Sequence, residues 1–586
     1  MIILAGLALE LILILSFVPA PLVPLTADSG MDELVPWLEV LGQPIHERLA
    51  SLRPGISLTR LAVILQMVCF LGLFLPYAGA LRALRTDGDL RVGRAVLLFG
   101  ALFQLTALAS RRLFSNDLFS YIFNGRIMTV YGANPYLAVP ARYPQDPLLP
   151  LVDWREVPNF YGPLWTLIGA ELTRLGGDEL GLTLLLFRLV PAAAAIAAGI
   201  LIWWTLRCWQ PRQAALGAAL WAWNPLVVLE SGVSGHNDAL LALLLVVAVW
   251  GLVRRRAVLG LLALTAAALI KYSAAVLGPL YLVVLLRRAP NAAARWRVLL
   301  GMVAAAGLAA ACFFPFWGGG GELAVSALVS SPARYLNSPA ELVYGQARLW
   351  LGDDSRLIVE RMEFRPWWAA AQRPLQLFLE RAEIPIGQVE EDQVVLAINR
   401  SDGRWQRVYD PVTRTTGYVA LAALRTTVRP RSLDADPEVA SYEIGPTGGA
   451  VAARVNLAIR LFGWLVVAAI GTALLWRAVT PDQLLSGWLT LLTLVYWLVA
   501  AWFFPWYLIW ALAVAALRPR GPLVWALVVW SAAVLTYYGL VTLEGDPTLG
   551  WLYRWRAVPM FLPPLLVLVG YAIATRVGRS PAALRS

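Results

Sequence analysis

Long apolar runs recur along the chain and constrain its fold more than any other feature. The sequence is 59% hydrophobic and 15% charged, whereas roughly a quarter of the residues of a soluble domain are charged. A membrane-spanning helix needs about 20 apolar residues. We therefore predict an all-α polytopic membrane protein with about 14 transmembrane segments, at residues 2–18, 58–80, 95–109, 182–206, 214–229, 239–253, 257–270, 272–286, 298–317, 455–476, 484–504, 507–517, 522–540 and 558–575.

Arginine accounts for nearly all of the positive charge and gathers in short loops between these runs. The net charge is +11. Basic residues favour cytoplasmic loops, so this pattern reports topology, and we expect no nucleic-acid partner. If the segments alternate, both termini are cytoplasmic and all basic clusters lie on one side, at residues 82–94, 207–212, 254–256, 287–297, 477, 518–520 and 576–585.

The N-terminus bears on signal-peptide cleavage, and the cysteines bear on disulfide formation and metal binding. Residues 1–20 lack a basic start and a small-residue cleavage site, so we expect a retained first span rather than a cleaved signal peptide. Cys69, Cys208 and Cys312 lie in or beside apolar runs without ligand-like spacing. We expect neither a disulfide framework nor a metal site from them.

Lys271 is the only lysine in the chain. Roughly 30 mostly apolar residues separate two cytoplasmic arginine clusters around it, enough for two short helices that go out and back. Lys271 then lies at the extracytoplasmic tip of this hairpin. A cation in an apolar stretch usually faces a cavity or a partner; the alternatives are a snorkelling side chain or an ion pair with a nearby carboxylate.

The same topology collects polar residues on the extracytoplasmic face, in the segments 111–180, 230–238 and 318–454. The last segment becomes soluble in character, with short β-rich runs separated by turn residues, which predicts a small antiparallel β module. Residues 403–424 resemble the end of a bacterial Src-homology-three-like barrel; a structural insertion that caps this face is the alternative. We predict four regions: an N-terminal transmembrane module at 1–317, an extracytoplasmic loop region at 318–384, the β module at 385–428 and a C-terminal transmembrane module at 429–586.

A series of short motifs, in order and at characteristic spacing, resembles the bacterial α-1,6-mannosyltransferases within the GT-C superfamily of membrane glycosyltransferases. The resemblance spans roughly residues 58–286 and resumes at 455, whereas the β module departs from it. The motifs are Ser115-Asn116-Asp117-Leu118-Phe119-Ser120-Tyr121, Asn134-Pro135-Tyr136, Tyr161-Gly162-Pro163-Leu164-Trp165, Trp223-Asn224-Pro225-Leu226, Gly235-His236-Asn237-Asp238, Ile270-Lys271-Tyr272 and Phe504-Pro505-Trp506-Tyr507.

The resemblance implies a polyprenyl-phosphate sugar donor and a catalytic carboxylate in the first extracytoplasmic loop. Asp117 occupies that position, and we expect it to act as the general base for the attacking acceptor hydroxyl. The alternative is a helix N-cap, because Ser115-Asn116-Asp117 precedes an apolar-periodic run.

Cations and donors are needed where negative charge develops on the leaving phosphate. We expect Lys271, Arg126 and His236 to bind that phosphate. A helix that opens at Asn237 and Asp238 could bind phosphate or sugar through free N–H groups; the alternative is a simple cap with His236 exposed.

Aromatic residues complete the expected site. Tyr161, Trp506 and Tyr507 could stack on a sugar or guide the prenyl tail, although interfacial aromatics need no such role. We expect no cofactor, and no ligand-like spacing supports a metal site built from His236, Asp238 and Asp117.

These observations predict a multi-pass glycosyltransferase of the bacterial plasma membrane with its active site on the extracytoplasmic face. It would move a sugar, mannose by resemblance, from a polyprenyl-phosphate donor to a glycan or glycolipid acceptor, in contact with membrane lipid. A transporter or flippase for lipid-linked sugars is the rival, and it predicts inverted repeats and mid-membrane charges. A polymerase or ligase of lipid-linked glycans is a further alternative.

Overall fold

The structure is a computed structural model of the 586-residue chain. It describes residues 1–17, 58–85, 90–110, 113–143, 145–155, 157–317, 335–351, 367–378, 385–397, 405–410, 412, 415–427, 450–543 and 548–576.

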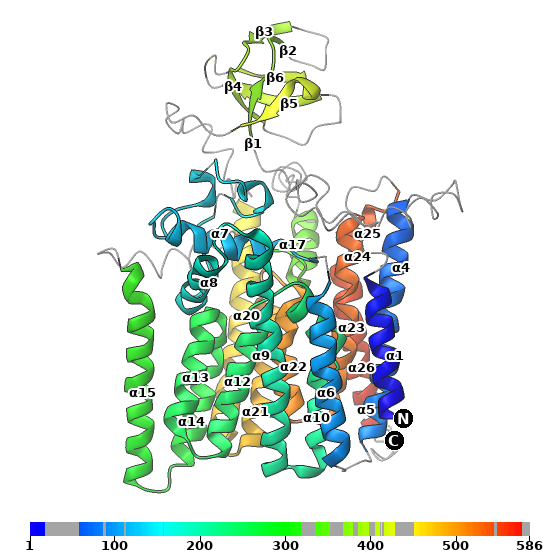
Figure 1. Cartoon of the computed structure of the whole chain (residues 1–586), viewed down its shortest axis with the longest axis vertical. Coiled ribbons are helices and arrows are strands. Elements are labelled where there is room, and N and C mark those ends of the chain that lie inside the picture. Colours follow the sequence, from blue (N-terminus) through cyan, green and yellow to red (C-terminus); the bar gives the residue numbers. More distant parts are fainter. Residues whose placement is uncertain are drawn as a thin grey trace. The chain divides into compact units, whose positions relative to one another are not determined.

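The described chain divides into two compact units, of which the larger is helical. Met1–Leu342 and Phe462–Ser586 form the helical unit, and Val343–Leu461 forms the second unit. Apolar helices rich in Ala and Leu run side by side through the helical unit (Figure 1). Its helices are α1 (Ile2–Ser16), α4 (Leu58–Gly72), α5 (Phe74–Leu84), α6 (Leu90–Leu108), α7 (Asp117–Thr129), α8 (Pro163–Gly176), α9 (Leu180–Trp209), α10 (Ala214–Ala222), α11 (Pro225–Val228), α12 (Asp238–Val253), α13 (Ala257–Ile270), α14 (Gly278–Arg287), α15 (Ala292–Phe313), α21 (Pro481–Leu494), α22 (Leu508–Leu517), α23 (Pro522–Ala533), α24 (Thr536–Thr542), α25 (Trp551–Arg554) and α26 (Ala557–Arg576). Helices α17 (Pro339–Trp350) and α20 (Ala450–Arg477) each begin in one unit and end in the other.

The predicted multi-pass helical architecture is confirmed, whereas the number of spans stays a prediction. Helices occupy each of the 14 predicted segments. Among the described residues, eight helices are long and apolar enough to cross a membrane, or up to nine if one bent pair counts as a single span. Four more apolar helices have 10–17 residues, among them α1 and α13. Length and composition in the structure therefore support fewer spans than the 14 predicted.

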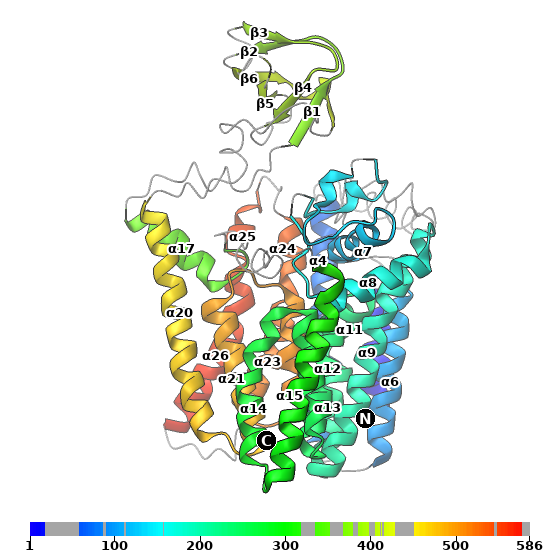
Figure 2. The ribbon, with the colours of Figure 1, turned by 90° about the vertical axis from the view of Figure 1, so that its left-hand side faces the viewer.

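The predicted hairpin with Lys271 at its tip is confirmed. Helix α13 ends at Ile270, and Lys271 adopts an extended conformation (φ −139°, ψ 119°). A 3₁₀ turn (Tyr272–Leu277) then leads into α14. Figure 2 shows α13 beside α12 in the helical unit.

A second break separates α11 from α12. The side chain of Asn224 accepts a hydrogen bond from the Leu226 N–H and starts α11, which continues as a π turn, Leu229–Val233. Gly235 follows with φ +70°, a conformation that disfavours a side chain. The two helices meet at 120°, and irregular backbone at membrane depth is tolerated where protein buries it or it lines a cavity. This bend positions His236, Asn237 and Asp238.

The second unit contains a seven-stranded antiparallel sheet of order β3-β2-β6-β5-β4-β1-β7. It includes the predicted runs, but it begins at Trp367, ahead of the expected start at Pro385. Alternate residues such as Val395, Val408 and Val419 form its small core. The strands are β1 (Trp367–Ala371), β2 (Leu375–Phe378), β3 (Pro385–Val389), β4 (Val394–Ala397), β5 (Trp405–Asp410), β6 (Thr415–Ala420) and β7 (Leu424–Thr426).

Candidate active site

Asp117 is the first residue of α7, a helix that is not among the candidate membrane spans. The N-cap residue of α7 is Asn116, whose side chain makes no capping hydrogen bond, and the Ser115 hydroxyl accepts from the Asp117 N–H at 3.2 Å. The partly buried Asp117 carboxylate instead accepts a hydrogen bond from the Tyr161 hydroxyl, at 3.1 Å between the two oxygens. The N-cap interpretation of Asp117 is therefore wrong.

The surroundings of Asp117 give its carboxyl group a pKa at which it can exchange a proton near neutral pH. Burial raises the pKa of Asp117 to about 6, while the charge of Lys271 and the Tyr161 hydrogen bond act in the opposite direction. Asp153 and Asp238 add smaller upward effects on this pKa. A carboxylate with a pKa near 6 is mostly ionised at neutral pH and can accept a proton there.

Two predicted motifs meet to hold Tyr161. The Tyr136 hydroxyl donates to the Tyr161 carbonyl at 2.7 Å, and the Asn159 side chain accepts from the Tyr161 N–H at 3.1 Å. Asn159 itself donates its backbone N–H to the Pro135 carbonyl at 2.9 Å. The loop that contains Asn134-Pro135-Tyr136 thus fixes the backbone of Tyr161, the residue whose hydroxyl contacts Asp117.

Lys271 forms a two-oxygen ion pair with Asp238. Its Nζ lies 2.9 Å and 2.7 Å from the two carboxylate oxygens, and the indole N–H of Trp510 donates to Asp238 Oδ1 at 2.7 Å. The Lys271 side chain is 11% exposed, and that of Asp238 is fully buried. Nζ also lies 5.0 Å from the centre of the Tyr507 ring and 5.8 Å from that of Tyr161. The ion-pair alternative for Lys271 is therefore observed.

His236 is fully buried and does not lie at the surface. Its ring stacks on Trp506 at 3.8 Å between centroids and 16° between planes. Nδ1 lies 3.4 Å from the Tyr121 hydroxyl, and Nε2 lies 3.4 Å from Glu230 Oε2. The alternative of a simple cap with an exposed His236 is wrong, because the ring is buried against Trp506.

The other predicted residues divide between the site and its surroundings. Trp506 stacks on both His236 and Phe504. Asn237 is buried beside Asp238 and makes no side-chain cap for α12. Arg126 donates from Nε to Asp146 at 2.8 Å, and nine residues of α7, about 14 Å of helix, separate it from Asp117. The structure thus brings together Asp117, Tyr161, Lys271, Asp238 and Tyr507, and leaves Arg126 apart.

Sequence reasoning missed Glu230, Tyr121, Trp510 and Tyr538, although the first three lie within or beside segments it singled out. Their contacts join residues that are distant in sequence, such as the Tyr538 hydroxyl, which donates to Glu230 Oε1. Within the described parts of the chain, no group of three or more His, Cys, Asp or Glu side chains could hold a metal ion.

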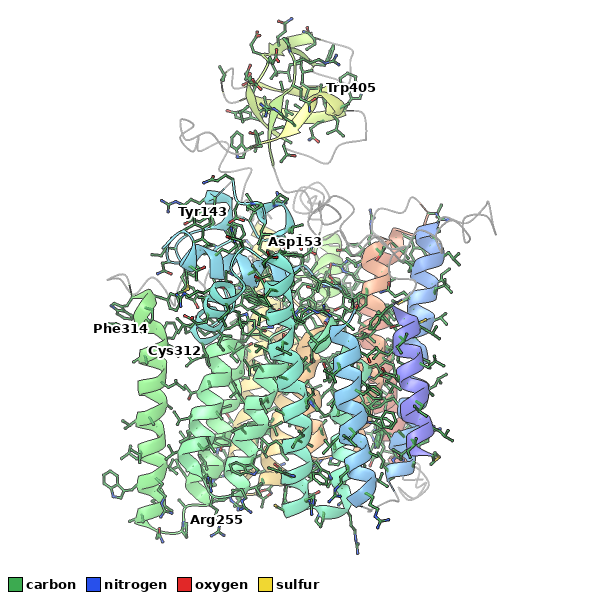
Figure 3. All side chains as sticks on the ribbon, viewed as in Figure 1. Tyr143, Asp153, Arg255, Cys312, Phe314 and Trp405 are labelled. Carbon is green, nitrogen blue, oxygen red and sulfur yellow. The ribbon has the colours of Figure 1, made fainter. Side chains whose placement is uncertain are left out.

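The site lies at the end of the helical unit opposite a basic cluster. Figure 1 shows α7 and α8 gathered at one end of the helices. In Figure 3, Tyr143 and Asp153 lie at that end, and Arg255 lies at the other. Asp153 accepts a hydrogen bond from Asn116, the neighbour of Asp117, at 3.3 Å. The fold and this placement define a multi-pass helical membrane protein with a carboxylate site in a loop region at one end of its helices.

Comparison with known proteins finds one matching family model. Residues 35–287 match the family model of the alpha-(1->6)-mannopyranosyltransferase N-terminal domain. Over this stretch the chain is similar to the alpha-(1->6)-mannopyranosyltransferases, and the resemblance predicted from its motifs is confirmed.

Curated relatives match a shorter stretch. A probable alpha-(1->6)-mannopyranosyltransferase of Mycolicibacterium smegmatis is 32% identical over 146 residues, which cover 24% of this chain and 25% of the relative. An alpha-(1->6)-mannopyranosyltransferase of Mycobacterium tuberculosis is 32% identical over 147 residues, 24% of each chain. Alpha-(1->6)-mannopyranosyltransferase A of Corynebacterium glutamicum is 28% identical over 170 residues, 28% of this chain and 34% of the relative. The match thus spans a quarter to a third of the length of these relatives, and no solved structure matches the chain.

Proposed function

We propose that this protein transfers a mannosyl residue from a polyprenyl-phosphate donor to a hydroxyl group of a glycan or glycolipid acceptor, with Asp117 as the general base. The observation that carries the proposal is the carboxylate of Asp117, oriented by Tyr161 and under the influence of the Lys271 charge, in the first long loop of a mannosyltransferase-family domain. Such a carboxylate has the position and the pKa that proton abstraction from a sugar hydroxyl requires.

The reaction is a single displacement. The acceptor oxygen attacks the anomeric carbon while Asp117 takes its proton, and the bond between that carbon and the phosphate oxygen breaks. The leaving polyprenyl phosphate keeps the electron pair, and the configuration at the anomeric carbon is inverted. Asp117 is then neutral and regains its charge by releasing the proton to water.

Lys271 is our candidate for stabilising the leaving phosphate. Asp238 binds its ammonium group, and the Trp510 indole N–H in turn donates to Asp238. A phosphate group would therefore meet a cation that is already oriented, which is the arrangement that stabilises charge in a transition state. The Tyr507 ring beside Nζ offers an apolar face for the sugar or for the first prenyl unit.

We place this reaction on the extracytoplasmic side of the membrane. The arginine clusters favour the cytoplasm, and the labelled Arg255 lies at the end of the helices opposite the loop region that contains Asp153 (Figure 3). A lipid-phosphate donor suits this side, because it remains anchored in the membrane and needs no soluble nucleotide.

The test is transfer by purified protein in lipid nanodiscs. Radiolabelled polyprenyl-phosphate mannose, polyprenyl-phosphate glucose and a nucleotide-linked mannose are each offered with envelope glycolipids as acceptors. We expect transfer from polyprenyl-phosphate mannose and its loss in Asp117→Asn. The matched control is Asp178→Asn, which changes an exposed carboxylate between α8 and α9. Transfer from the nucleotide sugar alone, or no transfer by the unaltered protein, would contradict the proposal.

A further inference from the structure

Two tryptophans from distant parts of the sequence stack on one another in the loop region near Asp117. Trp154 belongs to the loop before α8, and Trp502 follows the π turn Val495–Val499 that comes after α21. Their rings lie 5.0 Å apart between centroids, with 21° between planes. Both side chains are partly exposed, so the pair offers aromatic surface to a molecule that approaches from the loop side.

The pair is connected to Asp117 through neighbouring rings. The Trp154 ring lies edge-on to Phe160, at 6.2 Å between centroids and 81° between planes. Phe160 packs against Tyr161 at 4.5 Å, and the Tyr161 hydroxyl donates to the Asp117 carboxylate. A continuous series of aromatic rings thus leads from the candidate base to Trp502.

Asp153 adds a carboxylate beside this series. It directly precedes Trp154, its side chain is exposed, and its Oδ1 accepts a hydrogen bond from the Asn116 amide at 3.3 Å. Asn116 in turn directly precedes Asp117. The loop that carries the first tryptophan is therefore bound to the segment that carries the candidate base, and the charge of Asp153 is close enough to raise the pKa of Asp117.

Hydrogen bonds hold both loops in place. The Arg155 guanidinium donates to two backbone carbonyls of the loop that carries Trp154, at 2.9 Å and 2.7 Å. At the second tryptophan, the Leu336 N–H donates to the Ala501 carbonyl at 2.7 Å, and the Phe503 N–H donates to the Leu336 carbonyl at 3.0 Å. Because these supports are already ordered, a ligand that packs on the two rings loses little affinity to the cost of ordering them.

We propose that Trp154, Trp502 and Asp153 form the acceptor subsite, and that it binds an uncharged, hydroxyl-rich glycan. This inference rests on the proposed function and names the residues that select its acceptor. The C–H face of a sugar ring packs on an aromatic ring, and a carboxylate accepts hydrogen bonds from sugar hydroxyls. Ligand sites commonly combine such apolar surface with a few polar groups that fix the orientation of the ligand.

Charge favours the acceptor over the donor at this position. The carboxylates of Asp153 and Asp117 would repel a lipid phosphate, whereas sugar hydroxyls are uncharged. The cation that we propose for the donor phosphate, Lys271, is instead paired with Asp238 at the start of α12. The acceptor hydroxyl must also reach Asp117, and the series of rings ends at that carboxylate through Tyr161. The tryptophan pair therefore suits the substrate that gives up the proton.

The first test measures the KM for each substrate in nanodiscs, with an α-1,6-linked mannotriose as acceptor. Trp154→Ala and Trp502→Ala should each raise the acceptor KM on the order of tenfold, as expected when a tryptophan anchor of a binding site is removed, and should change the donor KM less than about twofold. Asp153→Asn should also raise the acceptor KM, although its amide oxygen can still accept from Asn116. The matched control is Trp296→Ala, which removes an exposed tryptophan of α15 and should leave both KM values in place.

Two conservative variants keep the test decisive if the alanine variants fold poorly. Trp502→Phe retains an aromatic face and should stay close to the unaltered protein in acceptor KM. Trp502→Leu keeps an apolar side chain without that face and should match Trp502→Ala. Equal acceptor KM values in the Phe and Leu variants would overturn the inference, because only apolar volume would then matter. An equal rise in the donor KM would overturn it as well.

Binding without turnover separates the subsite from the proposed function. Asp117→Asn protein in nanodiscs is mixed with the mannotriose, and saturation-transfer NMR reports which sugar protons contact the protein. Saturation should reach the ring C–H protons, and adding Trp154→Ala or Trp502→Ala should abolish it, whereas adding Trp296→Ala should not. This result would stand even if no mannosyl transfer were detected. Saturation that is absent, or unchanged in the tryptophan variants, would overturn the inference and leave the pair as ordinary membrane-interface residues, even if mannosyl transfer were observed.

Discussion

The backbone N–H of Gly162 donates to the carbonyl of Ile270 at 2.9 Å. This single bond ties the turn that follows Tyr161 to the residue before Lys271. The bond therefore links the segment of Tyr161, the hydrogen-bond partner of Asp117, to the segment of Lys271. The two segments are more than a hundred positions apart in the sequence. Pro163, at the first position of α8, has no N–H to satisfy and lets the helix start at this contact.

Gly162→Ala should lower transfer strongly, because a Cβ at this position would overlap the carbonyl of Leu269. The two segments must separate to make room, and a misplacement of about 1 Å can cost on the order of 10²-fold in rate. The measurement is kcat in nanodiscs, with protein amount normalised by size-exclusion profile. Gly278→Ala in the same hairpin is the control, since a Cβ there meets nothing within 4 Å. Equal activity of the two variants would argue against a role for the close approach.

The rate should depend on pH through Asp117. Its pKa is raised to about 6, and a general base works when it is ionised, so kcat/KM should rise with pH through about 6 and level off above it. The Tyr161 hydrogen bond lowers this pKa, so Tyr161→Phe should move the acid limb to higher pH. If the acid limb of the kcat/KM profile did not move in Tyr161→Phe, a group other than Asp117 would set the pH dependence.

The same pKa has a consequence for stability. Because the folded pKa lies above that of the unfolded chain, the folded state binds more protons between the two values, and the contribution of Asp117 to stability falls as pH rises through this window. Asp117→Asn should therefore melt at a temperature equal to or above that of the unaltered protein at pH 7. A markedly lower melting temperature would show that the carboxylate stabilises the fold.

The sequence predicts the helical segments and the placement of Lys271 well, because apolar runs and arginine clusters reflect the physics of the bilayer directly. It also singles out Asp117, Tyr161 and Asp238, which the structure brings together with Lys271. The inward orientation of His236 could not be predicted, because it depends on the 120° bend between α11 and α12 and on the stacking with Trp506.

The position of Arg126 is a second feature that could not be predicted from the sequence. Its motif position is close to that of Asp117 along the chain, but its partner Asp146 lies on a loop whose path only the fold determines. The sheet was predicted to begin too late, since β1 and β2 lie before the turn-rich region and β1 pairs with β4 and β7. Such pairings between distant strands leave no local signal.

Lys271→Met should raise the KM for the donor while leaving the KM for the acceptor nearly unchanged. The change also leaves the buried Asp238 without its cation, and breaking such a pair typically costs about 3–5 kcal/mol. The double variant Lys271→Met/Asp238→Asn removes both charges and should recover the folding yield without recovering donor affinity. Recovery of donor affinity in the double variant would mean that the ion pair is purely structural.

The native Cys208 reports the topology. It is exposed at the end of α9, next to an arginine cluster that we assign to the cytoplasm. An impermeant thiol reagent should label it in inside-out membrane vesicles and not in right-side-out ones. A cysteine introduced as Asp178→Cys, at the other end of α9, should show the opposite pattern once Cys208 is replaced by Ser. Labelling of both positions from one side would contradict a membrane-spanning α9.

The β unit should be removable, provided that the excision respects its strands. The predicted boundary at Pro385 would leave β1 without β4 and β7, and β2 without β3 and β6, exposing unpaired edges that favour aggregation. Replacing residues 367–427 by a short flexible linker removes the whole sheet together with its core. We expect this variant to fold and to transfer mannose to a small synthetic acceptor, whereas the deletion of 385–427 should aggregate. If the full excision abolished transfer to small and native acceptors alike, although the protein stayed monodisperse and kept its melting temperature, the sheet would be part of the catalytic apparatus rather than an insertion.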